Sequence, residues 1–301
     1  MLLIGLGEIA ALITAVSWAA SAQIHTTASR MIGPLNVPVV RIPLYMTAIS
    51  LVGLVTGWST HLPEGAFFFI AVSGVMGISL ADPLLYGGSV IIGPRLAVLI
   101  QSLSTCITAL AGYVFLGENL NFMGWAGIFT ASFGVSFVLM EGGVRHRTDF
   151  SSLTPMQWAK GAGMVLLSAT SMSIGFLLLK RGMRYDVDPI WATFIRISFG
   201  GGMLWLMMLV RGKLFRVMRE TWASWRIMRI LLVGTCVSTV GNCLATVAMA
   251  NTQAGIAATL IGLQPIMIMI VNSLVERKRP TARAVIGTAI AFGGTAMIFL
   301  R

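Results

Sequence analysis

Long apolar runs separated by short polar stretches dominate this chain. A helix needs about 20 residues to cross the roughly 30 Å hydrocarbon core of a bilayer, and ten runs are long enough. They span residues 3–25, 36–57, 66–87, 93–115, 121–140, 158–180, 188–210, 228–249, 254–275 and 281–300. The runs are continuous and do not alternate with a period of two, so they favour helices over the strands of a membrane β-barrel. The pattern predicts an all-α integral membrane protein with ten transmembrane helices.

One long polar stretch divides these spans five and five. It predicts a first five-helix half over residues 1–140, a linker over 141–157 and a second five-helix half over 158–301. Because each half has an odd number of spans, the two halves must insert in opposite directions. Inverted repeats of this kind are a recurring plan of secondary transporters, which bind their substrate near the midplane of the bilayer.

The halves also align with each other, weakly but throughout. Arg41 in the second span falls on Arg196 in the seventh, and Asp82 in the third span falls on Asn242 in the eighth. Self-similarity of this kind indicates that the two halves share one fold.

Composition agrees with a membrane protein. Hydrophobic residues make up 56% of the 301 residues and charged residues only 10%, whereas a soluble domain carries roughly 25% charge. The net charge of +11 does not indicate nucleic-acid binding, because the basic residues are spread over short loops. The three cysteines and three histidines show no metal-ligand spacing, so we expect neither a metal nor another cofactor.

The basic residues also predict an orientation. Of the 21 Lys and Arg residues, fifteen lie in or beside the odd-numbered loops, four lie on the opposite side and two lie within spans. The positive-inside rule then places the odd loops in the cytoplasm and both termini outside. The short loops suit the inner membrane of a bacterial cell. No Lys or Arg precedes the first run, so we expect that span to be kept and not removed as a signal peptide.

Four further features recur in order along nearly the whole chain. They are Trp18 in AVSWAAS, Arg41 and Arg196 early in the second and seventh spans, Pro265 in LQPIM, and Glu118 in FLGENL, echoed by Glu276. Together they resemble the EamA-type branch of the drug/metabolite transporter superfamily. The resemblance implies two inverted five-helix repeats around a central cavity, lined mainly by the first, third, fourth, sixth, eighth and ninth helices. The chain departs from the repeat at Ser104, where the second half has Pro265.

Asp82 is the first candidate for function. Ionisable groups inside membrane spans are costly and are therefore functional candidates by default. Pro83 follows it, lacks a backbone donor and should disturb the helix, and a carboxylate beside a broken helix suits a coupling proton or a cationic group. The alternative is a structural ion pair between Asp82 and Arg95 across a short loop.

Four other ionisable residues are candidates for coupling or gating. They are Glu8, Arg41, Arg95 and Arg196. The symmetric pair of Arg41 and Arg196 favours a structural or gate role, although a guanidinium can also hold an anionic substrate. Glu8 lies near the start of the first span, where it either takes part in proton coupling or faces the membrane interface.

Neutral polar and aromatic side chains fall on the helices that the resemblance assigns to the cavity. Sites for small ligands are mostly apolar with a few placed polar groups. With Asp82, the candidates for substrate binding are Trp18, Ser21, Tyr86, Gln101, Ser104, Ser171, Asn242 and Gln264. The alternative for each is a hydrogen bond between helices.

These observations predict a secondary transporter, an exporter or facilitator of small polar metabolites such as amino acids, working by alternating access as a monomer or homodimer. A strongly anionic substrate is disfavoured, because Arg41, Arg95 and Arg196 all lie near span ends. The chain has no P-loop, no G-x-S-x-G and no H-E-x-x-H, so ATP hydrolysis and intramembrane enzyme chemistry are disfavoured. An intramembrane enzyme and a non-transporting sensor or partner subunit are the alternatives.

Overall fold

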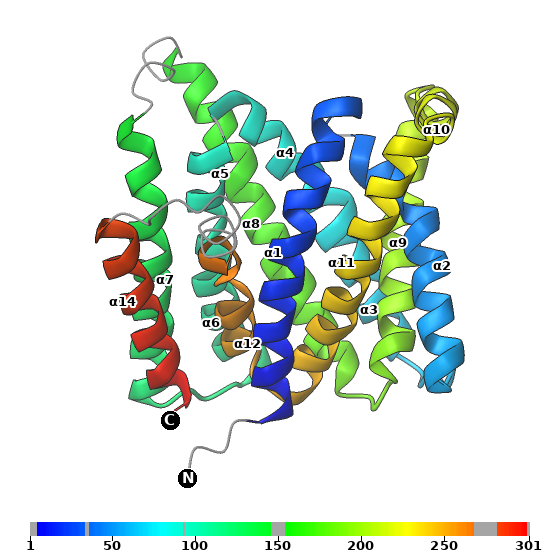
Figure 1. The fold of residues 1–301 in the computed structure, drawn as a ribbon. Coiled ribbons are helices and arrows are strands. Elements are labelled where there is room, and N and C mark those ends of the chain that lie inside the picture. Colours follow the sequence, from blue (N-terminus) through cyan, green and yellow to red (C-terminus); the bar gives the residue numbers. More distant parts are fainter. Residues whose placement is uncertain (1–4, 34–35, 93, 146–153, 268–281, 300–301) are drawn as a thin grey trace.

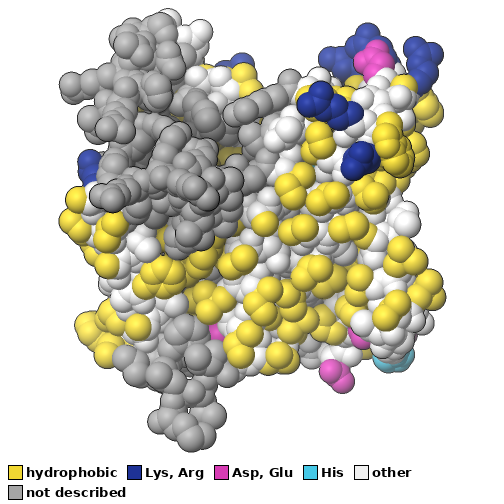
Figure 2. All heavy atoms as spheres, in the orientation of Figure 1, with side chains coloured by type: hydrophobic (Ala, Val, Ile, Leu, Met, Phe, Trp, Pro, Cys, Tyr) yellow, Lys and Arg dark blue, Asp and Glu magenta, His cyan; other side chains and the backbone are white. Residues whose placement is uncertain are grey.

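The computed structural model describes residues 5–33, 36–92, 94–145, 154–267 and 282–299. All regular structure in this part of the chain is helical, and the helices form one bundle (Figure 1). The helix α1 begins and α14 ends at the same end of the bundle, which we call the terminal face. The opposite end, where α10 lies, we call the basic face, because Lys and Arg gather there in Figure 2.

The two halves have the following helices. The first contains α1 (Leu6–Ile32), α2 (Asn36–Thr56), α3 (Ala66–Gly74), the π-helix η1 (Val75–Leu80), α4 (Ala81–Ile92), α5 (Pro94–Gln101), α6 (Leu103–Leu116) and α7 (Phe122–Arg145). The second contains α8 (Pro155–Met183), α9 (Pro189–Val210), α10 (Leu214–Trp222), α11 (Trp225–Asn251), α12 (Ala254–Ile261) and α14 (Ala282–Phe299).

Length and composition identify the membrane spans among them. Six helical stretches of at least 18 residues are apolar enough to cross a membrane: α1, α2, α3 to α4, α8, α9 and α11. Four shorter apolar stretches lie in α6, α7, α14 and the region that begins with α12. Their order along the chain matches the ten predicted spans, which confirms the prediction of an all-α membrane protein with ten helices.

The predicted boundaries were less accurate than the spans themselves. The linker prediction of 141–157 overlaps two helices, because α7 continues to Arg145 and α8 begins at Pro155. A capping box starts α8: the Thr154 hydroxyl accepts from the Gln157 backbone N–H at 3.3 Å, and the Gln157 side chain accepts from Thr154 N–H at 2.9 Å. This T-x-x-Q pattern is a known start signal and was present in the sequence.

Helices of one half pack against helices of the other. The first span, α1, lies along α11, and its counterpart α8 lies along α3, η1 and α4. The helices α1 and α8 run in opposite directions through the bundle (Figure 1), as inverted repeats require. The third span of each half is therefore held against the first span of the other half, which places Asp82 of α4 at the boundary between the halves.

Glycines allow this boundary to be tight where α3 meets α9. A Cβ atom added to Gly74 would lie only 2.0 Å from the carbonyl oxygen of Arg196, and one added to Gly200 would lie 2.5 Å from that of Gly74. The backbones of the two helices thus touch directly, as small residues permit in membrane bundles. This contact fixes the position of Arg196 along the bundle axis relative to the third span.

Candidate functional site

The helix that carries Asp82 is distorted just before it. The sequence predicted that Pro83 would break this helix; the structure instead has the π-helix Val75–Leu80, and an α-helix resumes at Ala81. A proline ring clashes with the carbonyl four residues earlier, and the wider π turn relieves that clash. Such π segments occur frequently at functional sites.

Two serines of α8 stabilise the distorted segment. The Ser171 hydroxyl donates to the carbonyl of Met76 at 2.8 Å, and the Ser168 hydroxyl donates to that of Ala81 at 2.8 Å. Ser171 was a candidate for substrate binding, but its hydroxyl is used in this contact between the halves. We therefore assign it to positioning Asp82 through the backbone of its helix.

Asp82 forms an ion pair with Arg41 of α2. Arg41 Nη2 lies 3.5 Å from Asp82 Oδ2, and Arg41 Nη1 lies 3.3 Å from His25 Nδ1. The Arg41 guanidinium also stacks over the ring of Tyr45 at 5.2 Å, whose hydroxyl donates to Ser238 of α11 at 2.6 Å. The side chain of Arg95 lies outside the described residues, so the pairing of Asp82 with Arg95 and the gating role of Arg95 stay predictions.

Arg196 of α9 lies in the same region of the bundle. Only 6% of it is exposed, it acts electrostatically on Asp82, and its guanidinium lies over the ring of Phe176 at 5.6 Å. Its Nη2 is so close to η1 that a Cβ atom added to Gly77 would be 2.8 Å away. Arg41 and Arg196 are near span ends in the sequence, and in the fold the charges of both act on Asp82.

The ion pair is partly accessible. A water-sized probe reaches 16% of the Arg41 side chain and 20% of the Asp82 side chain. Water or a polar solute can therefore contact both charges. Tyr86 of α4 is half-buried beside the same two residues, and so belongs to this group, which we call the charged cluster: His25, Arg41, Tyr45, Asp82, Tyr86 and Arg196.

Sequence reasoning missed two members of the charged cluster. His25 is not among the predicted candidates, because the first span was predicted to end at residue 25, whereas α1 continues to Ile32. Tyr45 lies one helical turn after Arg41, and this i, i+4 spacing was the available signal.

A second group of candidates gathers around Trp18. The Gln264 amide donates to the carbonyl of Trp18 at 3.4 Å, and the Ser21 hydroxyl donates to the same carbonyl at 3.1 Å. The indole packs against α11, where a Cβ atom added to Gly241 would be 2.6 Å from the ring. Asn242, the next residue of α11, is half-exposed.

The fourth and ninth spans are interrupted at matching places. The first interruption separates α5 from α6 at Ser102, directly after Gln101, and the second follows α12 at Gly262, just before Gln264. Pro265 explains the second, since it cannot donate to a helical carbonyl. At the first, the carbonyl of Ser104 accepts from the hydroxyl of Ser173 in α8 at 2.9 Å. The side-chain oxygen of Gln101 is buried without a hydrogen-bond partner.

Glu8 lies away from the charged cluster, at the terminal face. It accepts from the Thr252 hydroxyl at 2.9 Å, and Lys180 of α8 donates to the carbonyl of Thr252 at 2.7 Å. Glu118 accepts from the backbone N–H of Ala254 at 2.8 Å, at the start of α12. These residues join helices of both halves; we call them the terminal seal: Glu8, Glu118, Lys180, Thr252 and Ala254. Glu276 lies outside the described residues.

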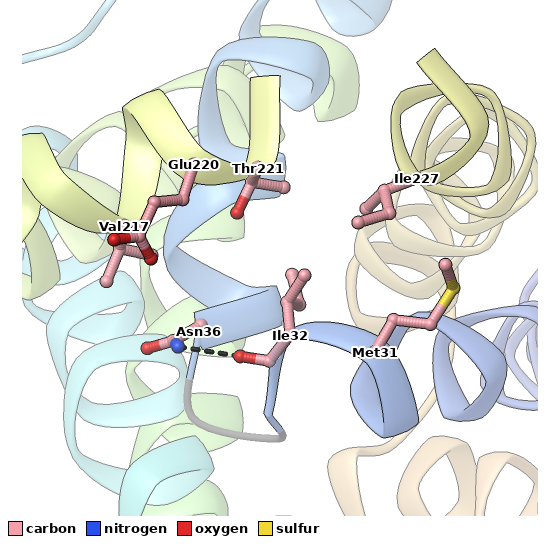
Figure 3. A pocket seen from close by; sticks show the side chains of 7 residues that line it. All are labelled: Met31, Ile32, Asn36, Val217, Glu220, Thr221 and Ile227. Atoms are coloured by element: carbon pink, nitrogen blue, oxygen red, sulfur yellow. Dashed lines mark hydrogen bonds between the residues drawn. The ribbon is translucent and has the colours of Figure 1, made fainter. Parts of the chain in front are cut away.

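A separate cavity of about 270 Å³ opens at the basic face. Figure 3 shows it between the adjoining ends of α1 and α2 on one side and α10 and α11 on the other, with Glu220 and Asn36 at one edge. None of the predicted site residues lines it, and the side-chain amide of Asn36 already donates a hydrogen bond to the carbonyl of Ile32 at 2.7 Å. We therefore do not assign the substrate to this cavity.

Comparison with known proteins agrees with the helical membrane fold described above. The model of the EamA-like transporter family matches residues 5–140 and 159–300. A solved structure entitled "Crystal structure of protein" superposes with a TM-score of 0.78 and 16% sequence identity, over 98% of this chain and 96% of the other; at this identity it shows the fold alone. No curated protein matches the chain.

Proposed function

Because the chain belongs to the EamA-like transporter family, it is a multi-pass membrane transporter of the drug/metabolite type, and we propose that it carries small polar metabolites such as amino acids. The proposed path runs between the two inverted halves and past the charged cluster. The proposed location is the inner membrane of a bacterial cell, with both termini outside and the protein acting as a monomer or homodimer.

One observation carries this proposal: the ion pair between Arg41 and Asp82, at the boundary of the halves, is partly accessible. A purely structural pair would be expected to exclude water, since an accessible pair contributes little to stability. Arg41 and Asp82 instead keep 16% and 20% of their side chains open to a water-sized probe. Polar groups of a passing solute would meet these charges first.

The terminal seal supports an alternating-access cycle. It joins α1, α6, α8 and the α11–α12 junction at one end of the bundle. In the proposed cycle, one half rocks against the other and the seal opens while the basic face closes. Inverted repeats move in this way around a fixed central site in many secondary transporters.

Flux into proteoliposomes tests the proposal. Purified protein, reconstituted without other proteins, should carry at least one labelled amino acid at a rate above that of protein-free vesicles. Flux without a partner supports the proposal. Chemical turnover of a solute without flux would favour an intramembrane enzyme, and binding without flux or turnover would favour a sensor or partner subunit.

A further inference from the structure

The charged cluster carries an uncompensated positive charge. Arg41 pairs with Asp82, the charge of Arg196 also acts on Asp82, and among the described residues Asp82 is the one acid that acts on either arginine. Arginine stays protonated in proteins. Two guanidinium groups and one carboxylate give a net charge of +1, which a ligand or a counterion must balance.

Arg196 also has an unused hydrogen-bond donor. It is 94% buried, since 6% of it is exposed, and its Nε has no partner. An unsatisfied buried donor is costly, and more so when it is charged. The Phe176 ring supplies a cation–π contact at 5.6 Å, which does not satisfy this N–H. An oxygen acceptor of a solute would relieve this penalty.

His25 does not compete for the same ligand. Arginine only donates hydrogen bonds, so His25 Nδ1 accepts from Arg41, and neutral His25 carries its proton on Nε2. That Nε2 is packed against α11, where a Cβ atom added to Gly234 would be 2.7 Å away. His25 therefore positions the guanidinium of Arg41, and its free donor is screened from solutes.

The ion pair between Arg41 and Asp82 is open to exchange. Its separation of 3.5 Å exceeds the roughly 2.7–2.9 Å of a strong charge-assisted hydrogen bond. Both side chains are accessible, so a solute can insert its own charges between them. A solute ammonium group would then meet Asp82, and a solute carboxylate would meet Arg41.

We infer that the charged cluster selects acidic amino acids: solutes with two carboxylates and one ammonium group. The two carboxylates would pair with Arg41 and Arg196, the ammonium group would pair with Asp82, and the net charge of −1 would neutralise the cluster. The inference rests on the proposed function and narrows its substrate class. It revises the expectation from the sequence, which disfavoured anionic substrates because the arginines lie near span ends.

Matched ligands test this charge balance on the unmodified protein. Thermal unfolding in detergent and proteoliposome flux are measured with L-glutamate, L-aspartate, L-glutamine, L-asparagine and glutarate. The acids should bind at least tenfold more tightly than their amides, and glutarate, which lacks the ammonium group, should also bind more weakly than glutamate. Specific binding stabilises the folded protein by mass action, so the shift in melting temperature reports affinity.

Variants of Arg196 test whether this residue causes the preference for acidic amino acids over their amides. Arg196→Gln should reduce the ratio of glutamate to glutamine affinity toward one, whereas Arg196→Lys, which keeps the charge, should retain part of it. Arg216→Gln, on the exposed side of α10, is the matched control and should leave the ratio unchanged. Flux of the amides equal to or faster than that of the acids in the unmodified protein would overturn the inference but not the proposed function. No flux of any amino acid would overturn both.

Discussion

Asp82 lies within the third membrane span, where an isolated charge would be costly. An ionisable group within a membrane protein nearly always pairs with another or lines a watery space. Asp82 does both, since it pairs with Arg41 at 3.5 Å and keeps 20% of its side chain accessible. Its carboxylate is therefore both the structural partner of Arg41 and the group that a solute cation would contact.

Replacing Asp82 by Asn should abolish transport while the protein still folds. The amide keeps the shape but removes the charge that a solute cation would contact. Losing one partner of a charge pair within a binding site costs roughly 2–5 kcal/mol of binding free energy, so we expect flux to fall about 100-fold or more. Proteoliposome flux and the melting temperature are the measurements.

Asp186→Asn is the matched control for this change. Asp186 is an exposed residue with a φ of 57°, a conformation that Asn adopts readily, so flux should be unaffected. Normal flux in Asp82→Asn would remove Asp82 from the transport site.

Glu118 provides a test of the terminal seal at the scale of one residue. It accepts from the Ala254 N–H, one of the amides that a helix start leaves without an internal partner. Glu118→Ala should lower the free energy of unfolding by about 1–2 kcal/mol, measured by denaturant titration in detergent. Glu64→Ala, an exposed loop change, should have almost no effect; equal losses in both variants would show that the hydrogen bond contributes nothing.

Residue type alone predicted part of the candidate site. Asp82, Arg41 and Arg196 were found because charges are rare in apolar runs. Their convergence could not be predicted, because it depends on how α2, α4 and α9 pack and on the π turn before Asp82. Tyr45 shows the same limit, since its hydroxyl reaches Ser238 in the other half.

At the scale of elements, the direct backbone contact between α3 and α9 sets the geometry of the charged cluster. Gly74 lies against the carbonyl of Arg196, and Gly200 lies against that of Gly74. No side chain separates the two helices here, so a shift of α9 would move Arg196 relative to Asp82.

Gly74→Ala should therefore damage both stability and transport. The added Cβ would be 2.0 Å from the Arg196 carbonyl, which forces the backbones apart, and overpacking of this kind costs about 1–3 kcal/mol. The readouts are the melting temperature and flux.

Gly202→Ala tests whether helix propensity alone explains the result. Gly202 lies in α9 with nothing within 4 Å of its added Cβ, so alanine should be neutral or slightly stabilising there. If Gly74→Ala behaved like Gly202→Ala, the contact between α3 and α9 would be looser than described.

The elements were predictable to different degrees for physical reasons. Continuous hydrophobicity is a strong signal over 20 residues, so the ten spans were found. The helix α10 was missed because it is nine residues long and carries Arg216 and Arg219, and its apolar residues are too few to form a run. The interruption at Ser102 was missed because no proline marks it; neighbouring helices supply its hydrogen bonds.

At the scale of the whole molecule, basic side chains are concentrated at one end of the bundle. Lys and Arg gather at the basic face, where acidic atoms are also seen among them, and further acidic side chains are seen toward the terminal face in the same view (Figure 2). Exposed basic residues of α10 and the start of α11 contribute Arg216, Arg219, Arg226 and Arg229. The first described helix, α1, begins at the opposite, terminal face, and the last, α14, ends there (Figure 1). One assignment of orientation therefore fixes the side of every loop.

The positive-inside rule predicts that the terminal face is outside the cell, and two single-cysteine variants decide this. In a background with Cys106, Cys236 and Cys243 replaced by alanine, Ser59→Cys places a thiol in the exposed loop between α2 and α3 at the terminal face, and Ala223→Cys places one between α10 and α11 at the basic face. A membrane-impermeant maleimide should label Ser59→Cys in intact cells and Ala223→Cys only after permeabilisation. The reverse pattern would place both termini in the cytoplasm, and the terminal seal would then close the inner side of the path, with the charged cluster loaded from outside.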